Sequence, residues 1–154
     1  MARIRDELHA DHVRLERLFS ELVDTVEGAD APTIQDMWTR FESGLLAHFD
    51  AEERYILPLL ERDHAAEVQG IEQEHDRLRR MVAELGVRAD LHTLRKSVVD
   101  ELVATLKAHA EREDRTLYPL ADATLDEEAQ HNLLEFLRRE TRRRVEGLSN
   151  RVVG

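Results

Sequence analysis

Residues 48–58 read HFDAEERYILP, and residues 109–119 read HAEREDRTLYP. Each segment begins with a histidine, has a glutamate four residues later and ends with a proline ten residues after the histidine. Residues four positions apart on an α-helix share one face and lie about one turn apart, so each histidine can bind the same ion as its glutamate, or a neighbouring one. A His-x-x-x-Glu pair that occurs twice in a short chain therefore predicts a metal site.

A second repeat precedes each of these segments. Residues 11–15 read DHVRL and residues 74–78 read EHDRL, and their histidines stand 36 and 34 residues, respectively, before the histidine of the His-x-x-x-Glu pair that follows. Two copies of the same pattern in the same order predict two related helical hairpins.

Apolar side chains recur every three or four residues along most of the chain, as in amphipathic helices. The first four such stretches cover residues 4–26, 34–59, 68–85 and 91–120. Thr33 is expected to cap the second helix, Gly86 to end the third, Asp90 to cap the fourth and Pro119 to end or kink it. A fifth amphipathic segment, over about residues 126–145, should pack outside the others or mediate association.

The composition agrees with a helical protein. Only six of the 154 residues are glycine and three are proline, and 36% of all residues are charged. No run alternates apolar and polar residues as a half-buried strand would. This length is typical of one domain and sufficient to bury a core. The chain has no cysteine, which leaves nitrogen and oxygen donors for any metal. We predict an all-α fold.

The net charge of −11 argues against nucleic acid or an anionic membrane as a partner, because both are bound through positive surfaces. The stretch from Arg138 to Arg144 is a local exception, which we interpret as a solvated helix face. The N-terminal residues form no apolar signal segment, and no stretch reaches the roughly 20 apolar residues of a membrane span. We therefore expect a cytoplasmic protein.

Six polar residues occupy positions within the apolar stripes, where charged groups are rarely found. They are His12, His48, Glu52, His75, His109 and Glu113. Burying four imidazoles and two carboxylates without partners would cost several kcal/mol each, whereas a pair of cations would satisfy them. Histidine and carboxylate donors suit iron, manganese or zinc, and two bridging carboxylates are typical of two iron ions. We predict a centre of two iron ions, with zinc or manganese less favoured.

This pattern resembles the hemerythrin-like HHE cation-binding domains over about residues 4–122. The resemblance implies an antiparallel up-down four-helix bundle over residues 1–124. Residues 125–154 would form a C-terminal helix and tail that pack on the bundle or extend from it. Ferritin-like bundles are less similar, because they use Glu-x-x-His motifs, in which the order is reversed and the gap is shorter.

The resemblance also implies the ligands of each helix. His12 would come from the first helix and His75 from the third, and each His-x-x-x-Glu pair would contribute both of its residues. The two glutamates, Glu52 and Glu113, would bridge the metals. Oxygen-carrying hemerythrins use an aspartate five residues after the fourth-helix histidine, where this chain has Asp114. Helix geometry favours Glu113 instead, because a residue five positions on is rotated by about 140°.

The chain departs from the oxygen-carrying hemerythrins at Ile71, where they have a second histidine on the third helix. One iron would lose a protein ligand, and an open or water-filled position favours reaction or sensing over reversible oxygen carriage. Tyr55, one turn after Glu52, and His9, one turn before His12, are candidates to fill that position.

The remaining histidines and the aromatic residues are assigned structural roles. His64, His92 and His131 are interpreted as surface or capping groups. The aromatic residues are interpreted as packing, with the alternative that they line an oxygen pocket or shield a radical; they are Trp38, Phe49, Tyr55 and Tyr118.

Three functions fit this site. The leading hypothesis is a non-haem di-iron protein that binds or senses oxygen, nitric oxide or iron itself, with a small diatomic ligand or peroxide as its partner. The first alternative is an enzyme that decomposes hydrogen peroxide or nitric oxide, with Tyr55 or His9 assisting proton or electron transfer. The second is a purely structural metal that stabilises the folded bundle. The sequence leaves open whether the protein is an enzyme.

Overall fold

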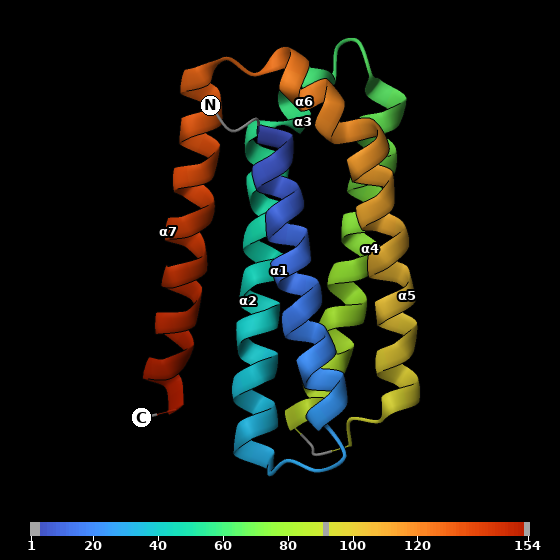
Figure 1. The fold of residues 1–154 in the computed structure, drawn as a ribbon, viewed down its shortest axis with the longest axis vertical. Coiled ribbons are helices and arrows are strands. Elements are labelled where there is room, and N and C mark those ends of the chain that lie inside the picture. The colour runs from blue at the N-terminus through green and yellow to red at the C-terminus, as the bar shows by residue number, and fades with distance from the viewer. Residues whose placement is uncertain (1–3, 91–92, 153–154) are drawn as a thin grey trace.

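The computed structural model describes residues 4–90 and 93–152 and shows a bundle of long helices (Figure 1). Four of them run side by side, alternately up and down: α1 (Ile4–Thr25), α2 (Ala31–Tyr55), α4 (Ala65–Asp90) and α5 (Lys96–Arg112). Within the described ranges no strand occurs, and no helix is long and apolar enough to cross a membrane. The predicted all-α bundle is confirmed.

Short elements close one end of the bundle (Figure 1). α3 (Leu57–Leu60) follows α2, while the π-helical turn η1 (Glu113–Leu117) and α6 (Tyr118–Thr124) follow α5. Pro58 stands in the first turn of α3, where a missing N–H breaks no helical hydrogen bond. Pro119 stands directly after the π-helical turn, and the backbone is helical on both sides of it. Pro119 therefore does not end the helix, which continues as α6 to Thr124.

The predicted cap of the second helix is wrong by three residues. Asp30 is the N-cap of α2, and its side chain accepts a hydrogen bond from the backbone N–H of Thr33 at 2.9 Å. Aspartate is among the best N-cap residues, and Pro32 favours the first turn that follows it.

The predicted boundary between the third and fourth helices is also wrong. α4 continues through Gly86 and ends at Asp90, so Asp90 does not cap the next helix. Gly86 has a packing role instead, because a Cβ atom there would lie 3.2 Å from the indole nitrogen of Trp38 on α2. The chain re-enters a helix at Lys96, and residues 91–92 lie outside the described part.

The apolar interior forms two clusters, and the six polar residues lie between them. On α1, Leu8 belongs to one cluster and Leu15 to the other, with His12 between them. On α4 the same order is repeated by Ile71, His75 and Leu78. α1 and α4 therefore each pass from one apolar cluster to the other through a polar centre.

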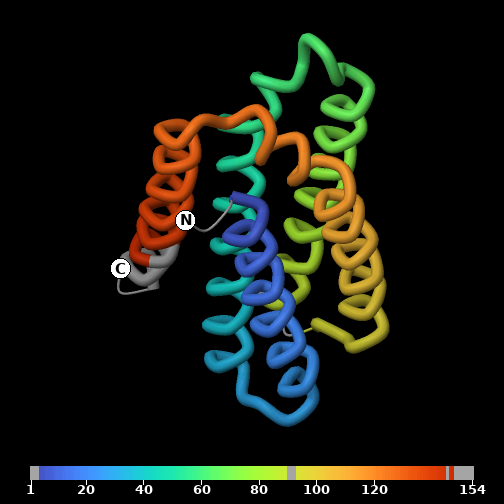
Figure 2. The backbone as a smooth tube through the Cα atoms, turned by 45° about the horizontal axis from the view of Figure 1, so that its top comes forward, coloured from blue at the N-terminus to red at the C-terminus, as the bar shows by residue number. Residues whose placement is uncertain are grey.

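The fifth long helix, α7 (Glu127–Val152), packs beside α2 in both views (Figures 1 and 2). Its Leu133, Phe136 and Leu137 are buried in the same apolar cluster as Leu8. The ring of Phe136 meets that of Tyr55 with 5.3 Å between centroids. α7 therefore packs on the bundle and shares one of its apolar clusters. The division into a bundle over residues 1–124 and a C-terminal part from residue 125 remains a prediction.

Candidate metal centre

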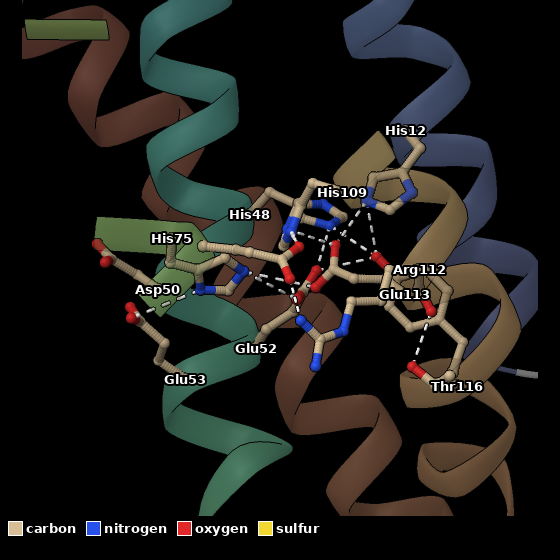
Figure 3. Close-up of polar contacts among 12 residues, drawn as sticks. His12, His48, Asp50, Glu52, Glu53, His75, His109, Arg112, Glu113 and Thr116 are labelled. Atoms are coloured by element: carbon tan, nitrogen blue, oxygen red, sulfur yellow. Dashed lines mark hydrogen bonds and ion pairs between the residues drawn. The ribbon is translucent and has the colours of Figure 1, made fainter. Parts of the chain in front are cut away.

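The six polar residues that were predicted to bind metal meet in the middle of the bundle (Figure 3). All are buried except His12, whose side chain is 11% exposed. Their potential ligand atoms form two groups, each with its atoms within 4.8 Å of one another. Half-site one consists of His12, His48, Glu52 and Glu113, and half-site two of His75, His109 and Glu113. Each half of the duplicated sequence thus contributes the two histidines of one half-site.

Both glutamates reach histidines of both half-sites. Glu113 Oε1 lies 3.2 Å from His12 Nε2 and 3.0 Å from His109 Nε2. Glu52, which belongs to half-site one, has its Oε2 atom 3.5 Å from His75 Nε2 in half-site two. Carboxylates placed between two sets of imidazoles are arranged to bridge two cations.

A carboxylate faces the outer ring nitrogen, Nδ1, of every histidine in the centre. The nitrogen–oxygen distances are 2.7 Å for His48–Asp11, 2.9 Å for His109–Glu74, 3.5 Å for His75–Glu53 and 3.8 Å for His12–Asp114. The two shorter contacts are hydrogen bonds, and the two longer ones are ion-pair distances. A carboxylate at this position orients the ring and makes the opposite nitrogen a better ligand. All four Nε2 atoms are thereby left for the middle of the centre.

Sequence reasoning missed these four carboxylates, although the duplicated pattern contains a signal for them. An acidic residue, Asp11 or Glu74, stands directly before each lone histidine, meaning a site histidine outside the His-x-x-x-Glu pairs. Another, Glu53 or Asp114, stands directly after the motif glutamate that ends each pair. The preceding acid contacts the motif histidine of its own half, and the following acid contacts the lone histidine of the other half. Spacing alone does not reveal this crossed pattern, because it depends on which helices are adjacent.

Two arginines hold supporting carboxylates from outside. Arg79 donates a hydrogen bond to Glu53 at 2.9 Å, and Arg112 donates one to Glu74. The guanidinium of Arg112 crosses α4 at Gly70, where any Cβ atom would clash with it. Behind His75 and His109 there is therefore first a carboxylate and then an arginine.

The pKa values show how strongly the metal-free centre is polarised. Burial alone would lower the pKa of His48, but its carboxylate neighbours, above all Glu52, outweigh burial and raise the pKa to about 10. Burial is likewise outweighed at His75, whose pKa rises to about 11 through Glu113 and the other nearby carboxylates. Protons therefore occupy these rings in the absence of metal, and a cation must displace them to bind.

Several buried atoms of the centre have no hydrogen-bond partner. Those that face the middle of the centre are Nε2 of His75 and of His109, Oε2 of Glu52 and both carboxylate oxygens of Glu113. An unsatisfied buried polar group costs about 1–3 kcal/mol, and more if it is charged. Cations would accept the lone pairs of all these atoms, and the nitrogen and carboxylate donors suit iron, manganese or zinc. The residues present therefore fit a bound metal.

Tyr118, which the sequence analysis interpreted as packing, also lies against the centre. Its buried hydroxyl lies 2.8 Å from His12 Nε2 and 2.9 Å from His48 Nε2, and it donates a hydrogen bond to Glu52 at 2.9 Å. The π-helical turn brings it there, because the N–H of Tyr118 bonds to the carbonyl of Glu113, five residues earlier. In a regular α-helix the two residues would be about 140° apart. Burial and the two negative glutamates raise the pKa of Tyr118 well above its usual value.

The two residues proposed for an open metal position lie outside both donor groups. Tyr55 packs against α7. The His9 side chain is 60% exposed and forms a 3.0 Å hydrogen bond with Asp114. Of the three histidines that were left out of the site, His64 and His131 are exposed, and His92 lies outside the described residues.

A pocket of about 240 Å³ lies between α1, α2 and α5 and reaches both half-sites. The histidines His12 and His109 line it, and exposed residues such as His9 and Lys107 are at its surface side. Its remaining walls are mostly apolar and include Phe19, Phe41, Leu45, Phe49, Val103 and Leu106. Phe49 also stacks on the ring of His75, with 4.2 Å between centroids. The pocket therefore extends from the surface to two histidines of the centre.

Comparison with known families identifies the class of protein. The model of the hemerythrin HHE cation-binding domain matches residues 3–121 and, in a second match, residues 67–153. The chain therefore belongs to the hemerythrin HHE cation-binding domain family, as the sequence resemblance implied. The two matches overlap in the second hairpin, in keeping with an internal duplication. No curated protein matches the chain, and no solved structure matches it.

Proposed function

We propose that the chain is a non-haem di-iron protein that binds or senses a small diatomic ligand, oxygen or nitric oxide. The observation that best supports this function is that Glu113 belongs to both groups of potential ligands. A carboxylate shared by two buried histidine pairs is arranged for one cation in each half-site. The proposed ligands are His12, His48, Glu52, His75, His109 and Glu113. Bound iron would supply a redox-active Lewis acid at this position.

The pocket supports a small uncharged ligand. Its apolar walls would admit a diatomic gas without the desolvation cost that an ion would meet. It also extends to both half-sites, since His12 and His109 both line it. On this proposal neither nucleic acid nor a membrane is a partner, in keeping with the net charge of −11.

An enzyme that decomposes hydrogen peroxide or nitric oxide is the second candidate, and one observation favours it. His9 is hydrogen-bonded to Asp114, and the other oxygen of Asp114 lies 3.8 Å from His12 Nδ1. This chain of groups joins the surface to half-site one and is suited to moving a proton to or from the centre. Turnover of peroxide that is lost in His9→Ala would support the enzyme, whereas unchanged turnover would remove this argument for it.

The direct test is the metal content and optical spectrum of protein purified from iron-supplemented cells. We expect two irons per chain, and a spectral change when oxygen or nitric oxide is added to the reduced protein without air. Reversal on removal of the gas supports binding or sensing, and steady consumption of peroxide supports the enzyme. Protein without iron, or with iron that no small ligand perturbs, would contradict the proposal.

A variant that narrows the pocket tests the route to the metals. Leu106→Phe should slow the spectral change with nitric oxide while leaving the iron content unchanged, because Leu106 lines the pocket but offers no ligand atom. Leu59→Phe is the matched control, since Leu59 is 52% exposed and lies at the end of the bundle that contains α3. Equal rates in both variants would show that the ligand enters elsewhere.

A further inference from the structure

We propose that Tyr118 is a further protein ligand of the metal in half-site one, bound through its deprotonated phenol oxygen. The inference rests on the proposed function, because it assumes that half-site one holds iron. It adds a residue outside the His-x-x-x-Glu pattern and makes the two metals of the centre chemically different.

The position of the hydroxyl is the first argument. It lies within 2.9 Å of three ligand atoms that belong to half-site one, namely His12 Nε2, His48 Nε2 and Glu52 Oε1. A metal bound by these three atoms must lie next to the phenol oxygen as well. Tyr118 is therefore placed on the same ion without any large movement of its side chain.

The lack of another partner is the second argument. The Tyr118 side chain is 1% exposed, and among the described residues its hydroxyl forms hydrogen bonds with His12, His48 and Glu52 of half-site one. A phenol can donate one hydrogen bond and accept two, so in the metal-free protein all its capacity is used by these groups. When a metal takes the lone pairs of His12, His48 and Glu52, the hydroxyl loses these partners, and coordination to the same metal is the available replacement.

The duplicated sequence supplies the third argument. Tyr118 stands directly before Pro119, and the equivalent position before Pro58 is Leu57. Leu57 is buried in an apolar cluster and has no atom that can bind metal. Half-site two therefore has no phenol at the equivalent position. Its donor group is His75, His109 and Glu113, with Glu52 Oε2 3.5 Å from His75, whereas half-site one would gain a fifth protein ligand.

The proton balance of this step is simple. The O–H bond of Tyr118 breaks as the metal–oxygen bond forms, and the proton leaves to solvent, as protons do when imidazole ligands are metallated. No electron is transferred. An external ligand would then bind preferentially to half-site two, whose His109 and neighbouring Phe49 line the pocket.

The test uses a spectroscopic property that no histidine or carboxylate ligand produces. Phenolate bound to iron(III) gives a visible charge-transfer band, and excitation in that band enhances the ring vibrations of the tyrosinate in the Raman spectrum. We expect both signals in the full-length protein loaded with iron(III). Tyr118→Phe should lose them, while Tyr55→Phe, the matched control at the only other tyrosine, should keep them.

Iron content and far-ultraviolet circular dichroism of the same samples separate the possible results. Unsubstituted protein that is helical and holds two irons but gives no phenolate signals would overturn the role of Tyr118 and leave the proposed di-iron function intact. Signals that persist in Tyr118→Phe would also overturn it. Protein that binds no iron would overturn both. If Tyr118→Phe fails to fold, Tyr118→His keeps the test decisive, because it should retain iron and lose the tyrosinate vibrations.

Discussion

Half-site one and half-site two are built on the same sequence pattern, yet they differ in their immediate surroundings. Each has two histidines, and a carboxylate faces the outer nitrogen of every ring. The difference comes from the residue before each proline. Before Pro119 it is Tyr118, whose hydroxyl contacts half-site one, and before Pro58 it is the apolar Leu57. The duplicated sequence thus supplies two similar groups of potential metal ligands, and the residue before the proline distinguishes their surroundings.

In the proposed two-metal centre, this difference would give the two ions different tasks. The half-site with more protein donors should hold its metal more tightly, and the half-site with fewer should be more open to an external ligand. The shared Glu113 makes the two positions interdependent, since it contributes to both.

Removal of the shared ligand should have the largest effect. Glu113→Ala is expected to reduce the metal content from two ions per chain to less than one, because both donor groups lose a carboxylate. Metal analysis of the purified variant measures this. Glu111→Ala is the control, since Glu111 is an exposed glutamate two residues earlier. Two ions retained in Glu113→Ala would contradict a bridging role.

Removal of one histidine from each half-site should separate the two positions. His75→Ala should leave one metal per chain, bound in half-site one. His12→Ala should lose less metal from half-site one than His75→Ala loses from half-site two, because Tyr118, His48 and Glu52 remain in half-site one. Titration with a chelator followed by metal analysis compares the two variants. Equal loss of metal from both would remove the distinction between the half-sites.

The metal-free protein should become less stable as the pH rises through the alkaline range. His48 and His75 have folded-state pKa values of about 10 and about 11, above the ordinary 6.5. The folded state therefore binds more protons than the unfolded state between pH 6.5 and about 10. The stabilisation is fully present below pH 6.5 and is lost as the pH rises towards these folded-state values.

Urea unfolding at several pH values measures this effect. The free energy of unfolding of the metal-free protein should fall steadily over that range. The metal-bound protein is the control and should lack this fall, because its imidazoles carry no proton at Nε2. A free energy of unfolding that is constant or rises with pH in the metal-free protein would show that these rings are not protonated when folded.

Substitution of the carboxylates that face the Nδ1 atoms should have the smallest effect on metal binding. Asp11→Asn and Glu74→Gln each replace a carboxylate hydrogen-bonded to one ligand, His48 or His109. Loss of such a partner typically lowers metal affinity about 10–100-fold, so both variants should still bind metal. Competition with a chelator quantifies the change, and Glu72→Gln, at an exposed position on α4, serves as control. Affinity unchanged in both variants would argue against this supporting role.

The fold was largely predictable from the sequence, because apolar residues at helical spacing determine which face of each helix is buried. The errors came where a residue has two possible roles. Gly86 is a common helix terminator, but here its missing side chain makes room for Trp38 in the middle of α4. Which role applies depends on the neighbouring helix and cannot be read from local sequence.

The same limit applies to the centre. The six candidate ligands were found because polar residues in apolar stripes need partners, and the structure brings all six together. Tyr118 was missed because its position depends on the π-helical turn, which changes the face on which a residue five positions after Glu113 lies. The carboxylates at Nδ1 were missed because two of the four pairs cross between the halves of the chain, as in Glu53 with His75.

The most direct test of a two-metal centre is a crystal structure of the iron-loaded protein with anomalous diffraction data collected at the iron absorption edge. Two anomalous peaks are predicted, one among His12, His48, Glu52 and Glu113 and the other among His75, His109 and Glu113. A single peak, no peak, or iron bound only at exposed histidines would contradict the centre described here.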